Sequence, residues 1–177
     1  YTAKAYDAAY QQASDLAAKG EYFKARTAFT TIGSYKDAQA RAEACVQPLP
    51  ENGSLNTGNG PDCAITISVP DSAQPTYIRF YNESGVPCGS IFVLPGNQAV
   101  VNLLGGSYYI KTASGTDWYG EVDLFGDTGT YQQVSYGTAG MFPLDTGATY
   151  NLTVGGQSGG NISTTNLESA EDLDSAK

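Results

Sequence analysis

The most distinctive stretch of this sequence is residues 116–131, TDWYGEVDLFGDTGTY, in which aromatic and acidic residues lie close together. It contains the only tryptophan of the chain, Trp118. An exposed indole or phenol ring can stack on a sugar ring while neighbouring carboxylates bond its hydroxyl groups. That chemistry predicts a ligand-binding site made of Trp118, Tyr119, Glu121, Asp123, Asp127 and Tyr131.

Two other interpretations of this segment remain open at the level of sequence. In the first, these acids bind a structural calcium ion, because they offer the oxygen ligands that Ca²⁺ prefers. Their spacing is not that of an EF-hand loop. In the other, Trp118 and Phe125 close one end of a β-sandwich while the acids face water. Apart from this calcium, we expect no cofactor and no metal site.

Two Asp-Thr-Gly triplets, at residues 127–129 and 145–147, match the signature of aspartic proteases, in which two carboxylates share one proton. Those proteases draw their triplets from two matching lobes or subunits, whereas here the triplets are eighteen residues apart. Asp-x-Gly is also ordinary turn chemistry, so we interpret both triplets as turns. The chain has no histidine, which removes Ser-His-Asp and Cys-His catalysis. We therefore expect no catalytic residues and no enzyme.

Composition points to a β-rich module. Hydrophobic residues make up 41% of the 177 residues and charged ones only 15%, with 21 glycines and 13 tyrosines, a mixture typical of strands joined by tight turns. The net charge of −9 is uneven, because residues 1–47 have a balance of +1 and the remainder −10. A surface of that sign repels phosphate backbones, so no nucleic-acid partner is expected.

No apolar run is long enough to cross a bilayer, and no signal-like segment opens the chain. We expect any membrane anchor to lie upstream of Tyr1.

The three cysteines cannot all pair internally. Cys63 and Cys88 fall near the starts of two predicted strands and could form a disulfide, whereas Cys45 ends a helical pattern and is expected to be a small buried residue.

The first 47 residues predict three short helices. Tyr6, Ala9, Tyr10, Ala13, Leu16 and Ala17 recur at three- and four-residue steps, which places them on one helical face. The pattern repeats after Gly20 and again after Gly33, and glycine at such positions ends a helix. Pro48 and Pro50 end the third of these helical patterns.

Gly20, Tyr22, Ala25 and Phe29, followed by Gly33, Tyr35, Asp37 and Ala38, resemble a tetratricopeptide-type helical hairpin. The variant "GSYKDA" is similar to hairpins of Gram-positive bacterial surface and regulatory proteins. The resemblance covers about a quarter of the chain. One hairpin plus one helix is shorter than a repeat array that buries its own faces, so we expect a packing appendage or the end of a longer array.

Residues 48–62 have the composition of a linker. From Cys63 onward the hydrophobic period becomes two, and turn-rich pieces separate short apolar runs, which favours a sandwich. The predicted strands are residues 64–69, 76–82, 90–94, 99–103, 107–112, 130–136, 149–154 and, more weakly, 161–165. For the tail, a short helix at 167–175 is the alternative to this last strand.

The segment GSIFVLPGNQAVVNLLGGSYYIKTASG, in which a Gly-Gly turn precedes a tyrosine-rich strand, resembles the prealbumin-like or carboxypeptidase-regulatory-like sandwiches of bacterial envelope proteins. It covers roughly a third of the chain. The resemblance implies a fold and an extracellular or cell-envelope location, and it implies no chemistry.

These observations predict an α+β protein with a short N-terminal helical hairpin of three helices and an antiparallel β-sandwich of seven to eight strands. The predicted organisation is a helical segment (1–47), a linker (48–62), a sandwich (63–166) and an acidic tail (167–177). The first functional hypothesis is a non-catalytic scaffold or adhesion module of a bacterial surface or secreted protein, with a protein or glycan partner at the cell surface. The alternatives are a protein-interaction unit acting through the hairpin, and a carbohydrate- or calcium-binding module using the Trp118 segment.

Overall fold

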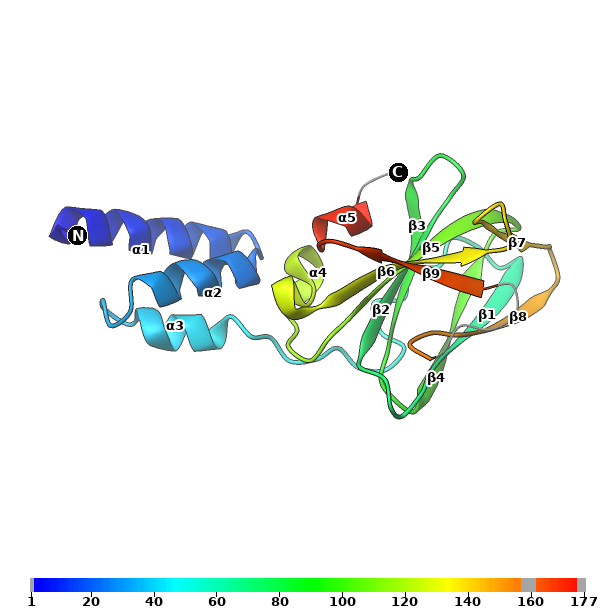
Figure 1. The fold of residues 1–177 in the computed structure, drawn as a ribbon, viewed down its shortest axis with the longest axis horizontal. Helices are drawn as coiled ribbons and strands as arrows, with labels where there is room; N and C mark the ends of the chain where they lie inside the picture. Colours follow the sequence, from blue (N-terminus) through cyan, green and yellow to red (C-terminus); the bar gives the residue numbers. More distant parts are fainter. Residues whose placement is uncertain (1, 157–161, 175–177) are drawn as a thin grey trace. The chain divides into compact units, whose positions relative to one another are not determined.

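The computed structural model describes residues 2–156 and 162–174. These residues form five α-helices, one 3₁₀ turn and nine strands, which confirms the predicted α+β class (Figure 1). The chain divides into two compact units, one made of Tyr1–Leu49 and Asp117–Thr128 and the other of Pro50–Thr116 and Gly129–Lys177. None of the helices in the described part of the chain is both long and apolar enough to cross a membrane.

The helical unit starts with α1 (Ala3–Ala18), α2 (Tyr22–Thr31) and α3 (Ala38–Ala44), at the three places that the sequence predicted. The Thr2 hydroxyl caps α1 by accepting a hydrogen bond from the Ala5 N–H at 3.3 Å. Gly20 and Gly33 follow the first two helices with φ of 77° and 59°, values that favour glycine. Each helix therefore ends where the backbone turns left-handed.

The predicted apolar stripes meet in one small core. Phe29 is fully buried at its centre, and Tyr10 contacts it edge-on with 5.7 Å between ring centroids. Tyr6 stacks on Tyr35 at 5.1 Å. The buried members are mostly small, which lets short helices approach closely: Ala13, Ala25, Phe29, Ile32, Ala38, Ala42 and Cys45.

A distant segment completes the helical unit. Residues 117–128 contain α4 (Gly120–Asp123) and the 3₁₀ turn η1 (Gly126–Thr128), and they cluster with the first 49 residues. The Gln47 N–H donates to the Trp118 carbonyl at 2.8 Å, which forms an isolated β-bridge. The sequence had predicted that this segment belongs to the sandwich, because it lies between two predicted strands.

The second unit is a two-sheet sandwich. The large sheet has the order β3-β2-β5-β6-β9, with the short β7 paired to β5, and the small sheet has the order β4-β1-β8. The strands are β1 (Cys63–Val69), β2 (Thr76–Tyr81), β3 (Pro87–Val93), β4 (Asn97–Leu103), β5 (Gly106–Ser114), β6 (Thr130–Tyr136), β7 (Phe142–Leu144), β8 (Thr149–Thr153) and β9 (Ile162–Leu167).

All eight predicted strands are present, with ends shifted by a few residues. Residue 161, the predicted start of the last one, lies outside the described residues. The ninth strand, β7, has three residues and is too short for an alternating pattern to reveal. One pairing differs from the expected antiparallel arrangement, because β8 runs parallel to β1. In the tail, α5 (Glu171–Asp174) lies within the predicted helix, and residues 175–177 lie outside the described part.

Alternation along each strand places the sandwich core between the sheets. Every second residue of β1, from Cys63 to Val69, is buried. These side chains pack against inward-facing residues of the large sheet such as Ile78, Phe80 and Ile91. The result is one continuous apolar core.

Residues 52–59, predicted to be linker, bind along one side of this sandwich. The Gly53 N–H donates to the Phe92 carbonyl on β3 at 2.8 Å, while the Asn52 side chain donates to the Gln98 carbonyl on β4 at 3.1 Å. Because β3 and β4 are the edge strands of the two sheets, this segment satisfies unpaired groups of both edges. The sandwich is thereby closed on that side.

Candidate functional site

The Trp118 segment was the leading candidate from sequence, and in the structure its acid Asp123 binds a helix end. The Asp123 Oδ2 accepts hydrogen bonds from the backbone N–H groups of Phe23 at 2.9 Å and Lys24 at 3.2 Å. Those N–H groups lie in the first turn of α2, whose own capping position, Glu21, makes no side-chain cap. Asp123 therefore supplies the missing N-cap, in the place where a helix dipole favours negative charge.

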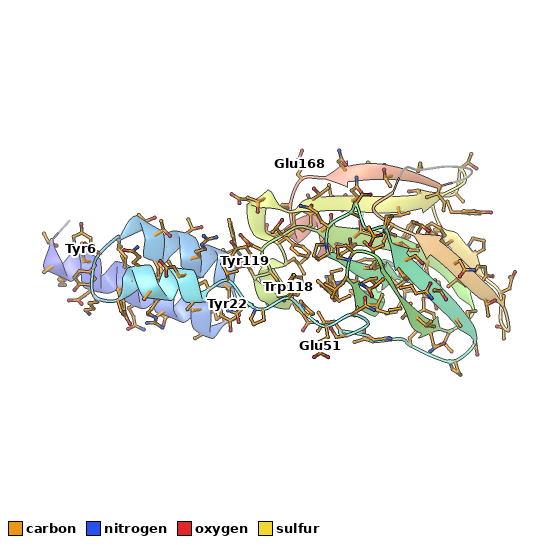
Figure 2. All side chains as sticks on the ribbon, turned by 90° about the horizontal axis from the view of Figure 1, so that it is seen from below. Tyr6, Tyr22, Glu51, Trp118, Tyr119 and Glu168 are labelled. Atoms are coloured by element: carbon orange, nitrogen blue, oxygen red, sulfur yellow. The ribbon has the colours of Figure 1, made fainter. Side chains whose placement is uncertain are left out.

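Trp118 and Tyr119, two of the aromatic residues of the segment, pack against other rings of the helical unit. Trp118 is 4% exposed and meets Phe125 edge-on with 5.1 Å between ring centroids. Tyr119, labelled beside Trp118 in Figure 2, is 1% exposed. Its ring meets Phe23 with 5.2 Å between ring centroids, and its hydroxyl accepts a hydrogen bond from the Arg26 guanidinium. Their ring faces are covered by this packing. Trp118 and Phe125 thus pack against each other within the helical unit.

The remaining members of the predicted site are two acids of the helical unit and one tyrosine of the sandwich unit. Glu121 and Asp127 are exposed on the helical unit. Tyr131 belongs to β6 in the sandwich unit and is 3% exposed. Across residues 2–156 and 162–174, no three acidic, cysteine or histidine side chains group as metal ligands would.

The aspartates of the two Asp-Thr-Gly triplets belong to different units. Asp127 is exposed in η1 of the helical unit. Asp145 is exposed in the turn after β7, where its carbonyl accepts a hydrogen bond from the Ala148 N–H at 3.0 Å. Each aspartate thus takes part in a turn, as the Asp-x-Gly composition predicts.

All three cysteines are free thiols. Cys63 donates a hydrogen bond from its sulfur to the Asp145 carbonyl at 3.0 Å, and Cys88 is half-buried on β3, so the possible disulfide between them is not formed. Burial raises the pKa of the Cys45 thiol and of the Cys88 thiol. Raised values keep both groups in the thiol form and lower their reactivity.

The sandwich contains an apolar cavity of about 340 Å³ that the sequence did not predict. Its size lies at the lower end of the range for small-molecule sites. Most of its wall is aliphatic or aromatic, with Asp145 and Asn151 as polar members. The lining residues are Ile65, Phe80, Tyr108, Ile110, Tyr136, Phe142, Pro143, Leu144, Asp145, Tyr150, Asn151, Leu152 and Ile162.

Tyrosine hydroxyls and rings shape this cavity. Tyr136 is 38% exposed and packs on Phe142 with 5.5 Å between ring centroids. The Tyr150 hydroxyl accepts a hydrogen bond from the Asp145 N–H at 2.7 Å, which ties β8 to the turn after β7. The Tyr108 hydroxyl donates to the Leu104 carbonyl at 2.7 Å. Two of the aromatic side chains are thus held in place by hydrogen bonds within the wall.

A second, more polar hollow of about 530 Å³ shares Asn151 and Ile162 with the cavity. Neutral hydroxyl and amide side chains contribute much of its surface, among them Thr112, Gln132, Thr153 and Thr164. The large sheet has more strands than the three-stranded sheet that faces it. On one side, the strands β6 and β9 of the large sheet extend past the small sheet. Residues of β6, β8 and β9 line both hollows.

Sequence reasoning could not assemble this cavity, because its walls come from seven strands that are distant in the chain. A partial signal was present in Tyr136, Phe142 and Tyr150, which flank glycine-containing turns and do not continue a regular buried alternation. Such aromatic residues at strand ends are as common in a closed core as at a pocket.

Comparison with known proteins assigns the chain to no family: no family model, no curated protein and no solved structure matches it.

Proposed function

We propose that this chain is a non-catalytic binding module of a bacterial surface or secreted protein, and that its sandwich holds a small neutral apolar or aromatic group. The observation that carries the proposal is the aromatic-lined cavity of about 340 Å³ between the two sheets. Protein interiors are normally close-packed, so an apolar space of this size with an exposed aromatic rim is characteristic of a binding site.

The two sides of the sandwich support this choice. Residues 52–59 close the side formed by β3 and β4, where Gly53 and Asn52 bond both edges. On the other side, among the residues that the structure describes, β8 and β9 are the last strands of their sheets and pair with β1 and β6. A ligand would therefore enter between β8 and β9, past Tyr136 and Ile162.

The surface or secreted setting is the part of the proposal that rests on resemblance. The tyrosine-rich strand after a Gly-Gly turn is similar to envelope sandwiches, and the "GSYKDA" hairpin is similar to surface proteins of Gram-positive bacteria. The acidic balance of −10 over residues 48–177 is consistent with a solvent-facing module.

The alternative that the helical hairpin is the interacting part receives less support. It requires apolar rings such as Tyr10 and Phe29 to be available to a partner. Phe29 is fully buried, and Tyr10 packs against it while its hydroxyl donates to the Asp37 carboxylate at 2.6 Å. The rings of the hairpin are largely used in its own core.

A neutral fluorescent amine, N-phenyl-1-naphthylamine, tests the cavity directly, because its emission rises when it leaves water for an apolar site. We expect saturable binding to the wild-type chain. The variant Ile162→Trp places a large ring at the cavity wall and should weaken binding about tenfold or more, the effect of losing about 1.4 kcal/mol. Ser163→Trp is the matched control, since Ser163 is the exposed next residue of β9.

Two results would contradict the proposal. One is a wild-type chain that shows no saturable signal. The other is a signal that Ile162→Trp leaves unchanged, which would place the dye elsewhere. Circular dichroism of both variants checks that the sandwich is intact.

A further inference from the structure

Two cationic side chains lie side by side on the outer face of the large sheet. Arg79 on β2 and Lys111 on β5 are directly opposite one another in the antiparallel register. Lys111 is 4% exposed. Like charges placed opposite one another in a sheet destabilise it, and a buried charge costs free energy unless it has partners. This pair therefore requires compensation from its surroundings.

Tyrosine rings provide the first part of that compensation. The Arg79 guanidinium lies 5.2 Å from the centroid of the Tyr77 ring, and the Lys111 Nζ lies 5.1 Å from that of the Tyr81 ring. Both rings are almost fully buried, at 3% and 1% exposure. Cation–π attraction is strongest where water is excluded, so these contacts favour keeping both charges in place.

The acidic tail provides the second part. The Lys111 Nζ donates a hydrogen bond to the Asp172 carbonyl at 2.8 Å, and the Tyr81 hydroxyl donates to the Leu173 carbonyl. Leu173 is fully buried. The segment 168–174, ESAEDLD, has four acidic residues and no basic one, and its α5 lies against this sheet in Figure 1.

The tail is recognised through features that a separate peptide can also offer. Two main-chain carbonyls accept the hydrogen bonds from Lys111 and Tyr81, and one leucine side chain fills the apolar position. The Asp172 carboxylate shapes the segment by accepting from the Glu168 and Ser169 N–H groups, each at 2.9 Å. None of these contacts depends on the covalent link to β9.

We propose that Tyr77, Arg79, Tyr81 and Lys111 form a binding site for an acidic, leucine-bearing peptide segment of a partner protein, and that the chain's own residues 168–174 occupy it when the partner is absent. Charge complementarity selects the acidic partner, because Lys111, which the tail contacts, has a second cation, Arg79, directly opposite it in the sheet. The site lies on the outer face of the sheet, so it is independent of the cavity between the sheets.

An intramolecular occupant lowers the apparent affinity for a partner by the fraction of molecules in which the site is open. A variant that weakens the binding of the tail to this site should therefore bind an added peptide more tightly. The probe is a fluorescein-labelled, end-blocked peptide with the sequence of residues 166–174, and the measurement is fluorescence anisotropy with the full chain. Leu173→Ala should bind the peptide about tenfold or more tightly than wild type.

Leu104→Ala is the matched control, because it truncates a leucine that is 43% exposed in the same unit; it should bind the peptide as wild type does. A peptide with alanine in place of its second leucine should bind at least about tenfold more weakly, because the buried anchor is lost. Adding Lys111→Met to Leu173→Ala should abolish the gain, because the cation that holds the carbonyl is removed. Thermal unfolding of each variant confirms that the sandwich remains folded.

Three outcomes would overturn the proposal. The first is a folded Leu173→Ala chain that binds the peptide no better than wild type does. The second is binding that survives Lys111→Met. The third is a concentration-dependent wild-type dimer that Leu173→Ala abolishes, because the occupant would then be the tail of a second copy and not a partner protein.

Discussion

The carboxylate of Asp123 accepts a hydrogen bond from the backbone N–H of Phe23 at 2.9 Å, across 100 residues of sequence. This contact ties the segment 117–128 to the first turn of α2. The segment leaves the sandwich unit after Thr116 and returns to it at Gly129. An insertion between two strands thus serves as part of a different structural unit, and its acids and aromatic rings are used in folding that unit.

We expect Asp123→Ala to destabilise the helical unit by about 1–2 kcal/mol, because it removes a cap from two backbone donors at a helix start. Asp123→Asn retains an acceptor oxygen and should cost less. Urea unfolding followed by the helical circular dichroism signal measures both. Asp127→Asn changes an exposed aspartate of the same segment and should stay within about 0.5 kcal/mol of wild type. Equal effects of Asp123→Ala and Asp127→Asn would show that the cap contributes nothing.

Gly126 provides a second test of how this segment packs. Its φ is 64°, and a methyl group there would lie 2.4 Å from the Cδ2 atom of Phe23. Gly137 has a similar φ of 57° but no heavy atom within 4 Å of such a methyl group. Gly137→Ala should therefore cost only the backbone strain of about 1 kcal/mol, whereas Gly126→Ala should cost a further 1–3 kcal/mol or so from overpacking.

The comparison of the two alanine variants is made by thermal unfolding. If Gly126→Ala and Gly137→Ala destabilise the protein equally, the predicted contact of Gly126 with Phe23 is absent in solution.

Trp118 decides between packing and ligand binding in its segment. Because its side chain is 4% exposed and packs on Phe125, we expect a blue-shifted emission and weak quenching by iodide. Titration with Ca²⁺ and with soluble glycans should leave the spectrum unchanged, since the ring face is covered. An accessible Trp118 whose emission changes saturably with one of these additions would restore the segment as a binding site.

The ion pair between Asp7 and Lys36 predicts a pH dependence. The Lys36 Nζ donates to the Asp7 carboxylate at 2.6 Å, and this hydrogen bond lowers the pKa of Asp7 and raises that of Lys36. Because the pKa of the Asp7 carboxyl is lower in the folded protein than in the unfolded chain, where it is about 4, the ion pair stabilises the fold above about pH 4. This stabilisation is lost as the pH falls through the folded pKa of Asp7. Because the pKa of the Lys36 amine is higher in the folded protein than in the unfolded chain, where it is about 10, the ion pair also stabilises the fold below about pH 10. This stabilisation is lost as the pH rises through the folded pKa of Lys36.

The pair should therefore contribute between roughly pH 4 and pH 10, and only weakly, because both side chains are exposed and salt screens them. Titration of the Asp7 carboxyl by NMR is the measurement. Lys36→Met should return the pKa of Asp7 towards its ordinary value, and 1 M salt should do so in part. If Lys36→Met leaves the pKa of Asp7 unchanged, the predicted ion pair between Asp7 and Lys36 does not form in solution.

Local patterns predicted the elements of this fold because the forces that form them act over a few residues. The three-and-four spacing from Tyr6 to Ala17 predicted α1, and the glycines at 20 and 33 marked the ends of the first two helices. Alternation from residue 64 to 69 predicted β1 almost to its bounds. Where the pattern is too short, as in the three residues of β7, the same reasoning found nothing.

The candidate sites were harder to predict, because their residues are far apart in sequence. The binding hypothesis for Trp118 and its neighbours rested on residue types, and the same types serve equally well in a packed core. The cavity beside Tyr136 lies where β6 and β9 extend the large sheet past the small one, and that depends on the order in which distant strands pair. Strand order is a property of long-range pairing that no local window contains.

By itself, the sequence determined the α+β class, the positions of three helices and eight strands, and the absence of histidine chemistry, because residue types and short periods are sufficient for each. Only the tertiary structure decided that Asp123 caps α2, that residues 52–59 close one side of the sandwich, and that Lys111 is buried beneath the acidic tail. The physical reason is the same in each case. A hydrogen-bond donor or a buried charge must find a partner, and which distant residue supplies it is settled only when the chain folds.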